Sequence, residues 1–266
     1  MPIAIRLQSY FRRAAKHLYD AVPIPPFTLF FHPSDPLPWL NYAIPDLPVS
    51  GDLSRPLAAL RVAFASRKRE PRFEFVEAFA PEVPASLRAA GFGEAARPHL
   101  MVLTPEELVV PPLPPGLTLE VLTPRSPLAT ARDFLAVQRR AFGTPGTGPV
   151  SEADASWLVT SLGEGRAFLA RLGGTPVGTG MFTHPLDGLT EIAGVATLEP
   201  FRRRGIGAAV THAAAALAFS RGAAMAVLSA ADERSGRVYA GVGFRASGHL
   251  LVYGDGKAVD SKDDPP

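Results

Sequence analysis

The stretch that decides the fold is EIAGVATLEPFRRRGIG, residues 191–207. Its first half predicts a strand, because Ile192, Val195 and Leu198 recur among small residues until Pro200 interrupts the pattern. The remainder runs directly into a helix, whose apolar residues recur at helical spacing: Ile206, Val210, Ala213 and Leu217. The stretch therefore predicts a strand, a glycine-bearing turn and a helix start, in that order.

A helix start of this kind can bind an anion. The first N–H groups of a helix have no intrahelical acceptor, and the helix dipole is positive at that end. Gly205 and Gly207 carry no Cβ, so a ligand can approach the backbone closely. Arginines at 202–204 add positive charge. We expect a pyrophosphate at this position; the alternative is a solvated arginine run beside an ordinary helix.

Two dinucleotide motifs are excluded here. A Rossmann fingerprint needs a third glycine where Val210 stands, and a P-loop needs Gly-Lys-Ser/Thr. What remains, Arg-x-x-Gly-x-Gly after a strand, resembles the acetyl-CoA signature of the GNAT superfamily of N-acetyltransferases. The resemblance implies a bulged strand before the motif, whose backbone bonds the pantetheine arm. The cofactor-binding residues that it implies are Val195, Ala196, Thr197, Arg202, Arg203, Arg204, Gly205, Ile206, Gly207, Ala208 and Asp232.

The sequence YAGVGF, residues 239–244, is similar to the Tyr-x-x-x-Gly-Phe motif of the same family. The resemblance implies that Tyr239 is catalytic, as a general acid toward the CoA sulfur. A phenol with a pKa near 10 is protonated at neutral pH and can donate; the alternative is a core tyrosine. The family usually has asparagine where this chain has Asp232, and an ionised aspartate accepts hydrogen bonds but donates none.

Glu191 is the candidate catalytic base. It stands eleven positions before Arg202, a spacing similar to that of the glutamate with which some family members deprotonate the amine. The alternative is a surface glutamate at the start of a strand. His184 is a second candidate, because an imidazole titrates near neutrality. The spacing of the other histidines suggests no metal site, and we expect none.

The two halves of the chain resemble each other. Ser54 and Phe92 are 38 positions apart, Gly205 and Phe244 are 39 apart, and each interval predicts helix, strand, helix and Gly-Phe. This suggests an internal duplication, although any strand-helix-strand unit has a similar pattern. The first half has DLSRP at 52–56 in place of the arginine-glycine motif. We therefore expect a degenerate N-terminal GNAT-like domain.

The predicted fold class is α/β (α+β), with a mixed, largely antiparallel sheet flanked by helices in each of two GNAT-type domains. The proline-rich run at 111–116 predicts a linker. It separates a degenerate domain, 1–110, from a catalytic acetyl-CoA-binding domain, 117–256. Loops at 143–150 and 184–189 are expected to select the acceptor, and the polar tail 261–266 is expected to be disordered.

Composition limits the function. The chain of 266 residues has no cysteine, which excludes thiol catalysis and disulfides. Its net charge of +2 gives no reason to expect nucleic-acid binding, and no apolar run is long enough to span a membrane. The N-terminus lacks the apolar segment of a secretory signal, so a cytoplasmic protein is expected.

The resulting hypothesis is an N-acetyltransferase that moves an acetyl group from acetyl-CoA, its co-substrate, to a primary amine. The acceptor is a small molecule or a peptide of unknown identity, and a homodimer is an open alternative to a monomer. The competing hypothesis is a non-catalytic acyl-CoA-binding or regulatory module. Tyr239 and Glu191 together favour the enzyme, whereas Asp232 in place of asparagine favours the module.

Overall fold

The computed structural model describes residues 1–143 and 148–255, which form two units with separate hydrophobic cores. The N-terminal unit comprises Met1–Leu100 and the segment that begins at Ser247; the C-terminal unit comprises Met101–Ala246. Part of the predicted loop 143–150 and all of the predicted disordered tail 261–266 lie outside the described residues. No helix in the described part has the length and apolar character needed to cross a bilayer.

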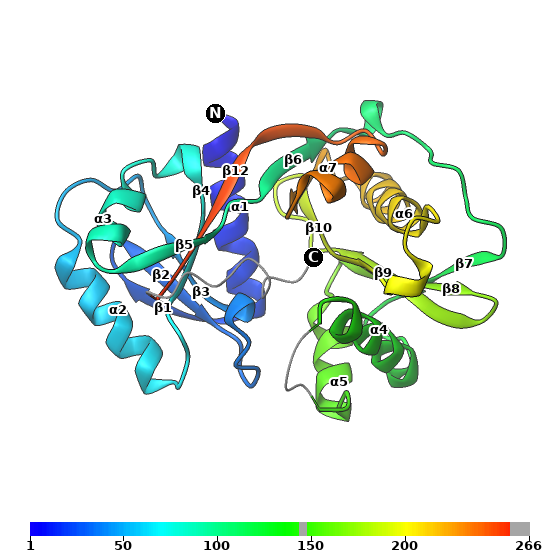
Figure 1. Cartoon of the computed structure of the whole chain (residues 1–266), viewed down its shortest axis with the longest axis horizontal. Coiled ribbons are helices and arrows are strands. Elements are labelled where there is room, and N and C mark those ends of the chain that lie inside the picture. Colours follow the sequence, from blue (N-terminus) through cyan, green and yellow to red (C-terminus); the bar gives the residue numbers. More distant parts are fainter. Residues whose placement is uncertain (144–147, 256–266) are drawn as a thin grey trace. The chain divides into compact units, whose positions relative to one another are not determined.

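The sheet of the N-terminal unit packs against three helices (Figure 1). Strands β1, β2 and β3 are antiparallel neighbours, β4 lies parallel to β3, and β12 pairs antiparallel with both β4 and β5. Its elements are α1 (Ile3–Leu18), β1 (Asp20–Ile24), β2 (Phe27–Phe31), β3 (Asn41–Pro45), α2 (Ser54–Ser66), β4 (Arg72–Val76), α3 (Val83–Ala89), β5 (Phe92–Ala96) and β12 (Arg245–Asp255).

Aromatic rings dominate the core of the N-terminal unit. The ring of Phe73 meets those of Phe27 and Phe92 edge to face, with centroids 5.5 and 5.0 Å apart. Tyr253 of β12 is fully buried and stacks on Phe75 of β4 at 6.3 Å. Such pairs add about 0.5–1.5 kcal/mol each to the free energy of burial. The last strand of the chain is therefore part of this core.

A glutamine side chain bridges the parallel strands β3 and β4. These strands share a single register pair, Ala43 with Phe73. Beside it, Gln8 of α1 is 2% exposed; its amide donates to the carbonyl of Pro45 at 3.0 Å and accepts from the N–H of Val76 at 2.9 Å. The side chain thus supplies partners to two backbone groups that the sheet leaves unpaired.

The C-terminal unit is built on the sheet order β7-β8-β9-β10-β11, antiparallel except for the last pair. Its elements are β7 (Leu117–Leu122), α4 (Leu128–Ala141), α5 (Glu152–Ser161), β8 (Arg166–Leu172), β9 (Thr175–Phe182), β10 (Leu189–Thr197), α6 (Ile206–Ser220), β11 (Met225–Ala230) and α7 (Glu233–Ala240). Strand β6 (His99–Leu103) lies at the boundary between the units.

Helices cover both faces of the second sheet. Along β8, Phe168 and Ala170 belong to the cluster under α6, whereas Ala167 and Leu169 belong to the cluster under α4 and α5. This alternation follows from the two-residue period of a strand. Figure 1 shows α6 and α4 on opposite faces of β8 and β9. The predicted fold class, a mixed and largely antiparallel sheet flanked by helices, is confirmed.

Two strands were not predicted from the sequence. β1 contains Pro23, which argues against a strand interior, but β1 is the terminal strand in the sheet order, where proline is tolerated. β5 has the sequence FGEAA, whose Gly93 and small residues give a weak strand pattern.

The compact units differ from the predicted domains 1–110 and 117–256. The division falls after Leu100, within β6, so the proline-rich run 111–116 lies inside the C-terminal unit. The segment from Ser247 onward belongs to the N-terminal unit, because Leu250 to Gly254 pair with β4. Pairing between strands that are more than one hundred residues apart leaves no local pattern in the sequence from which it could have been predicted.

We predict that Gln8→Leu destabilises the N-terminal unit. The change leaves the buried carbonyl of Pro45 and the N–H of Val76 without partners, at a cost of about 2–4 kcal/mol in unfolding free energy. Hydrogen exchange of the Val76 amide measures this locally. Lys16→Leu, an exposed change on the same helix, is the control and should leave that amide protected. Unchanged protection in Gln8→Leu would contradict the bridging role.

Candidate active site

The candidate site begins where two parallel strands separate. β10 and β11 pair only over three residues, from Leu189 beside Met225 to Glu191 beside Val227. β10 then continues along β9 as far as Thr197, and within the described chain it has no further register pair with β11. One edge of β10 is therefore open beyond the pairing.

A β-bulge lies in β10 at this point of divergence. Its register with β9 shifts between Ala193 and Ala196, and Gly194 adopts φ +60°. A Cβ on Gly194 would collide with Nε2 of Gln138, and the positive φ is itself strained for any other residue, so the position favours glycine. Gln138 Nε2 and Thr179 Oγ1 both donate to the Gly194 carbonyl, at 3.2 and 3.0 Å. The bulge implied by the family resemblance is present.

Past the bulge, backbone groups face the open side of β10. The N–H of Leu198 donates to the carbonyl of Val177 on β9 at 2.9 Å. Because alternate residues of a strand direct their backbone groups to opposite sides, those of Val195 and Thr197 point away from β9. Arg202 Nε donates to the Thr197 carbonyl at 3.2 Å. The backbone of Val195 remains accessible for a ligand.

The turn before α6 has the backbone geometry that suits an anion. Arg203 and Gly205 both have left-handed backbones, with φ +63° and +81°, and such turns direct successive N–H groups inward. Gly205 is the N-cap, and no side chain caps the helix. The N–H groups of residues 206–208 have no acceptor among the residues that the structure describes. With the helix dipole, they form a site for negative charge.

Two glycines of β9 let α6 lie close to the sheet. A Cβ on Gly178 would stand 2.8 Å from Cγ2 of Ile206, and one on Gly180 would stand 2.5 Å from Cγ1 of Val210. Larger residues at these positions would push the helix outward, together with its N-terminal N–H groups. The strand sequence therefore positions the anion site.

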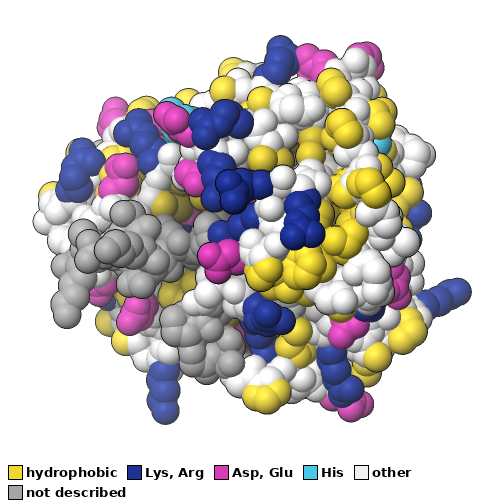
Figure 2. Space-filling model, turned by 45° about the vertical axis from the view of Figure 1, so that its right-hand side comes forward, with side chains coloured by type: hydrophobic (Ala, Val, Ile, Leu, Met, Phe, Trp, Pro, Cys, Tyr) yellow, Lys and Arg dark blue, Asp and Glu magenta, His cyan; other side chains and the backbone are white. Residues whose placement is uncertain are grey.

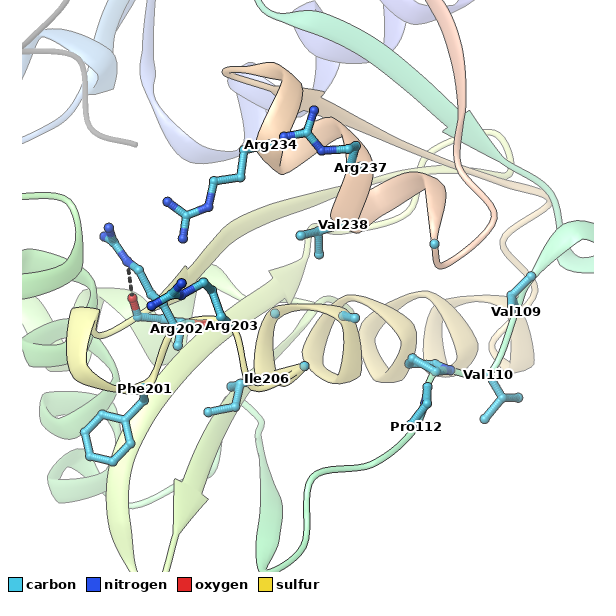
Figure 3. Close-up of a pocket in the computed structure, with 16 residues that line it drawn as sticks. Val109, Val110, Pro112, Phe201, Arg202, Arg203, Ile206, Arg234, Arg237 and Val238 are labelled. Carbon is cyan, nitrogen blue, oxygen red and sulfur yellow. Dashed lines mark hydrogen bonds between the residues drawn. The ribbon is translucent and has the colours of Figure 1, made fainter.

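Two adjoining cavities connect this turn to α7. The larger, of about 480 Å³, extends from the start of α6 to α7 (Figure 3). The smaller, of about 150 Å³, extends from β10 to α7. They share Thr197, Arg202, Gly207, Arg234 and Val238 in their walls, so they form one continuous groove. Arginine side chains and apolar residues line it. On the face shown in Figure 2, Lys and Arg side chains likewise lie beside hydrophobic surface.

The groove collects most of the residues predicted to bind the cofactor. Its walls include Val195, Ala196, Thr197, Arg202, Arg203, Gly205, Ile206, Gly207, Ala208 and Asp232. Arg204 is not among them; its guanidinium lies over the ring of Phe201 at 5.5 Å and donates to the carbonyl of Pro200 at 3.2 Å. Arg204 is therefore held against Phe201, which lines the groove, but Arg204 is not itself a lining residue.

Tyr239 lies in the wall of the smaller cavity. Its ring packs against Phe244, with centroids 6.3 Å apart. Burial, and secondarily the charge of Asp232, raises the pKa of Tyr239 to about 12. The hydroxyl therefore keeps its proton throughout the physiological range. This half-buried ring packs against Phe244 and belongs to a residue that lines the groove.

Asp232 is the N-cap of α7. Its carboxylate accepts the N–H of Ser235 at 2.7 Å and the hydroxyl of Ser235 at 2.7 Å. These bonds hold the pKa of Asp232 below its usual value. Asp232 lines the smaller cavity, but its carboxylate is already engaged in orienting the helix that carries Tyr239.

The candidate bases lie nearer the paired end of β10. Glu191 is half-buried, and its backbone exchanges hydrogen bonds with Thr183 at 2.9 and 3.1 Å. It is not among the residues lining either of the two cavities. His184 follows β9, and its Nδ1 accepts the N–H of Glu164 at 3.3 Å. The structure thus brings Tyr239 into the groove and leaves Glu191 outside its walls.

Sequence reasoning missed several groove residues. The segment 109–112, interpreted as the end of one domain and the start of a linker, forms one wall, and the N–H of Val109 donates to the carbonyl of Val242 at 3.0 Å. No local signal predicts that contact. Arg234 and Arg237 also line the groove. Their three-residue spacing on the predicted helix was a signal that both lie on one helix face.

The N-terminal unit has the same order of elements as the C-terminal unit. In it, side chains of the chain itself occupy the helix start and the gap between the parallel strands. β3, α2, β4 and α3 follow one another as β10, α6, β11 and α7 do. At the start of α2, the carboxylate of Asp52 accepts the N–H of Ser54 at 2.9 Å and its hydroxyl at 2.6 Å, which lowers the pKa of Asp52. Between β3 and β4 lies the amide of Gln8.

Comparison with known proteins agrees with this geometry. Residues 133–244 match the model of the acetyltransferase (GNAT) family. The chain is similar to a GCN5-related N-acetyltransferase from Kribbella flavida, with 28% identity, a TM-score of 0.80, and 98% of this chain and 99% of that one covered. A comparison with curated proteins finds no match.

Two more distant structures share the fold. One is a GCN5-related N-acetyltransferase from Sphaerobacter thermophilus, with 19% identity, a TM-score of 0.61, and 86% of this chain and 76% of that one covered. The other is a tandem GNAT protein from the clavulanic acid biosynthesis pathway, with 15% identity, a TM-score of 0.62, and 86% and 77% covered. The segment 133–244 thus matches the acetyltransferase (GNAT) family, and the chain as a whole is similar to GCN5-related N-acetyltransferases of known structure.

We predict that Tyr239 titrates far above a free tyrosine. Its pKa of about 12 in the folded protein exceeds the unfolded value near 10. The stability that the neutral phenol contributes is therefore fully present below about pH 10 and is lost as pH rises toward 12. The tyrosinate absorbance of the wild type minus that of Tyr239→Phe isolates this group. A difference curve with its midpoint near 10 would contradict the burial argument.

Proposed function

We propose that the C-terminal unit is an N-acetyltransferase that transfers an acetyl group from acetyl-CoA to a primary amine. The observation that carries this proposal is the continuous groove, which joins an anion site at the start of α6 to a protonated tyrosine on α7. The family at 133–244 accounts for acyl transfer in general. The acceptor belongs to the chemical class of small-molecule or peptide amines.

The residues present fit acetyl-CoA. A Cβ on Gly207 would lie 3.8 Å from Cγ1 of Val238 and 3.9 Å from Oγ1 of Thr197, so the missing side chain leaves room between α6, α7 and β10. The N–H groups of residues 206–208 and the arginines at 202 and 203 would hold the pyrophosphate. The open backbone of Val195 would bond the pantetheine amides.

Tyr239 would act as the general acid that protonates the leaving thiolate. The thioester supplies an activated acetyl group and a thiol leaving group. A phenol that is protonated at neutral pH can give its proton to a sulfur that carries developing negative charge. Asp232 supports this role indirectly, because it caps the helix on which Tyr239 is mounted and its charge disfavours the tyrosinate.

Glu191 would supply the base. An aliphatic amine is protonated at neutral pH and must lose that proton before it can attack a carbonyl carbon. Glu191 precedes the bulge on β10, and it would accept the proton directly or through water. Its place outside the two cavity walls favours transfer through water. The N-terminal unit would bind no second acetyl-CoA, because Asp52 and Gln8 hold the corresponding positions.

We predict that Gly207→Val weakens acetyl-CoA binding roughly 10- to 100-fold, because the added methyl groups crowd the groove. Calorimetric titration of the wild type should give one site per chain. Gly254→Val places the same side chain in β12, where a Cβ has no neighbour within 4 Å, and should bind normally. If Gly207→Val bound acetyl-CoA as tightly as the wild type, the binding site could not lie in this groove. Two equivalent sites in the wild type would show that the N-terminal unit also binds acetyl-CoA.

We predict different pH–rate profiles for two variants. Tyr239→Phe removes one hydroxyl and should lower the rate by about 10²–10⁴-fold at every pH, with acetyl-CoA affinity little changed. Glu191→Gln should regain activity as pH rises, because the amine is then neutral without a base. Acetyl transfer to a panel of amines, followed by CoA release, measures both.

Tyr253→Phe, in the N-terminal unit, is the matched control and should retain the wild-type rate. Full activity in Tyr239→Phe would show that Tyr239 has a packing role and no catalytic role. Acetyl-CoA binding by the wild type without turnover of any amine would favour the non-catalytic binding module.

A further inference from the structure

The larger cavity is lined by four arginines and by no acidic residue. They are Arg202, Arg203, Arg234 and Arg237. The first two belong to the turn before α6, and the other two belong to α7, on the opposite wall (Figure 3). Cations that face one another across a groove repel, and the repulsion falls when an anion of matching charge enters.

The arginines of the turn already have a place in the proposed pyrophosphate site. Arg202 is fixed by two carbonyls, since Nε donates to Thr197 at 3.2 Å and Nη2 to Ala141 at 3.4 Å. Arg203 is part of the left-handed turn before α6. These two charges match the charge of about −2 of a pyrophosphate diester.

The arginines of α7 are not needed for that group. Arg234 and Arg237 are exposed and lie three positions apart, on adjacent turns of α7. Arg234 makes no salt bridge within the described residues, and Arg237 meets Glu233 at 3.6 Å in an exposed i,i+4 pair, which is weak. In Figure 3 the side chain of Arg234 extends from α7 toward Arg202 and Arg203. Both guanidinium groups can therefore bind a second anion.

We propose that Arg234 and Arg237 bind the 3′-phosphate monoester of CoA and make this chain selective for CoA over dephospho-CoA. The inference rests on the proposed function and adds a second phosphate site to it. A phosphate monoester carries a charge of about −1.5 to −2 at neutral pH. Together with the pyrophosphate it matches the four arginines of the cavity. Arginine presents paired N–H donors to a phosphate, which is the geometry that this group binds best.

The test compares calorimetric titrations of CoA and dephospho-CoA. The wild type should bind CoA roughly 10- to 100-fold more tightly, as expected for charge-assisted hydrogen bonds. The double variant Arg234→Gln/Arg237→Gln should lose most of this preference while its affinity for dephospho-CoA changes little. Arg203→Gln should weaken both ligands alike and keep their ratio, because it acts on the pyrophosphate.

Arg221→Gln is the charge-matched control. It removes a cation just after the other end of the fifteen-residue helix α6, and both affinities should stay as in the wild type. Equal wild-type affinities for CoA and dephospho-CoA would overturn the proposal that Arg234 and Arg237 bind the 3′-phosphate. A preference for CoA that persists in the double variant would overturn it too. Neither result would contradict the acetyltransferase proposal. Failure of the wild type to bind either ligand would overturn both.

Discussion

The separation of β10 from β11 is the constraint on which the C-terminal unit depends. Three register pairs hold the strands together; beyond them a bulge at Gly194 shifts the register of β10, which continues along β9 but no longer pairs with β11. An open strand edge inside a protein leaves polar groups that need partners. The groove that results lies between β10, α6 and α7, and a ligand with amides and phosphates can supply those partners.

The N-terminal unit meets the same constraint from within the chain. Its parallel strands β3 and β4 share one pair, and Gln8 bonds to backbone groups beside it. At the start of α2, the carboxylate of Asp52 stands where a helix N-terminus would otherwise attract an external anion. One order of elements thus yields a unit with an open groove and a unit closed by its own side chains.

Much of the site could be predicted from the sequence because its signals are local. Glycines, arginines and a strand-to-helix transition at 191–207 predict a glycine-bearing turn and a helix start without knowledge of the fold, and the structure has Gly205 as the N-cap of α6 with no capping side chain. The direction of a single side chain is not local: Arg204 belongs to the same run as Arg202 and Arg203, yet it lies over Phe201. Contact with α7 likewise depends on packing, which is why Arg234 and Arg237 were missed.

The sequence by itself determined most of the elements, their order and the residue chemistry of the turn before α6, because propensity, periodicity and glycine placement act over a few residues. Only the tertiary structure decided which strand completes which sheet. β12 follows α7 in the chain but buries Tyr253 in the N-terminal core, and the segment 109–112 becomes a wall of the groove. Hydrogen bonds and apolar contacts between distant residues make these choices, and a residue pattern read along the chain does not contain them.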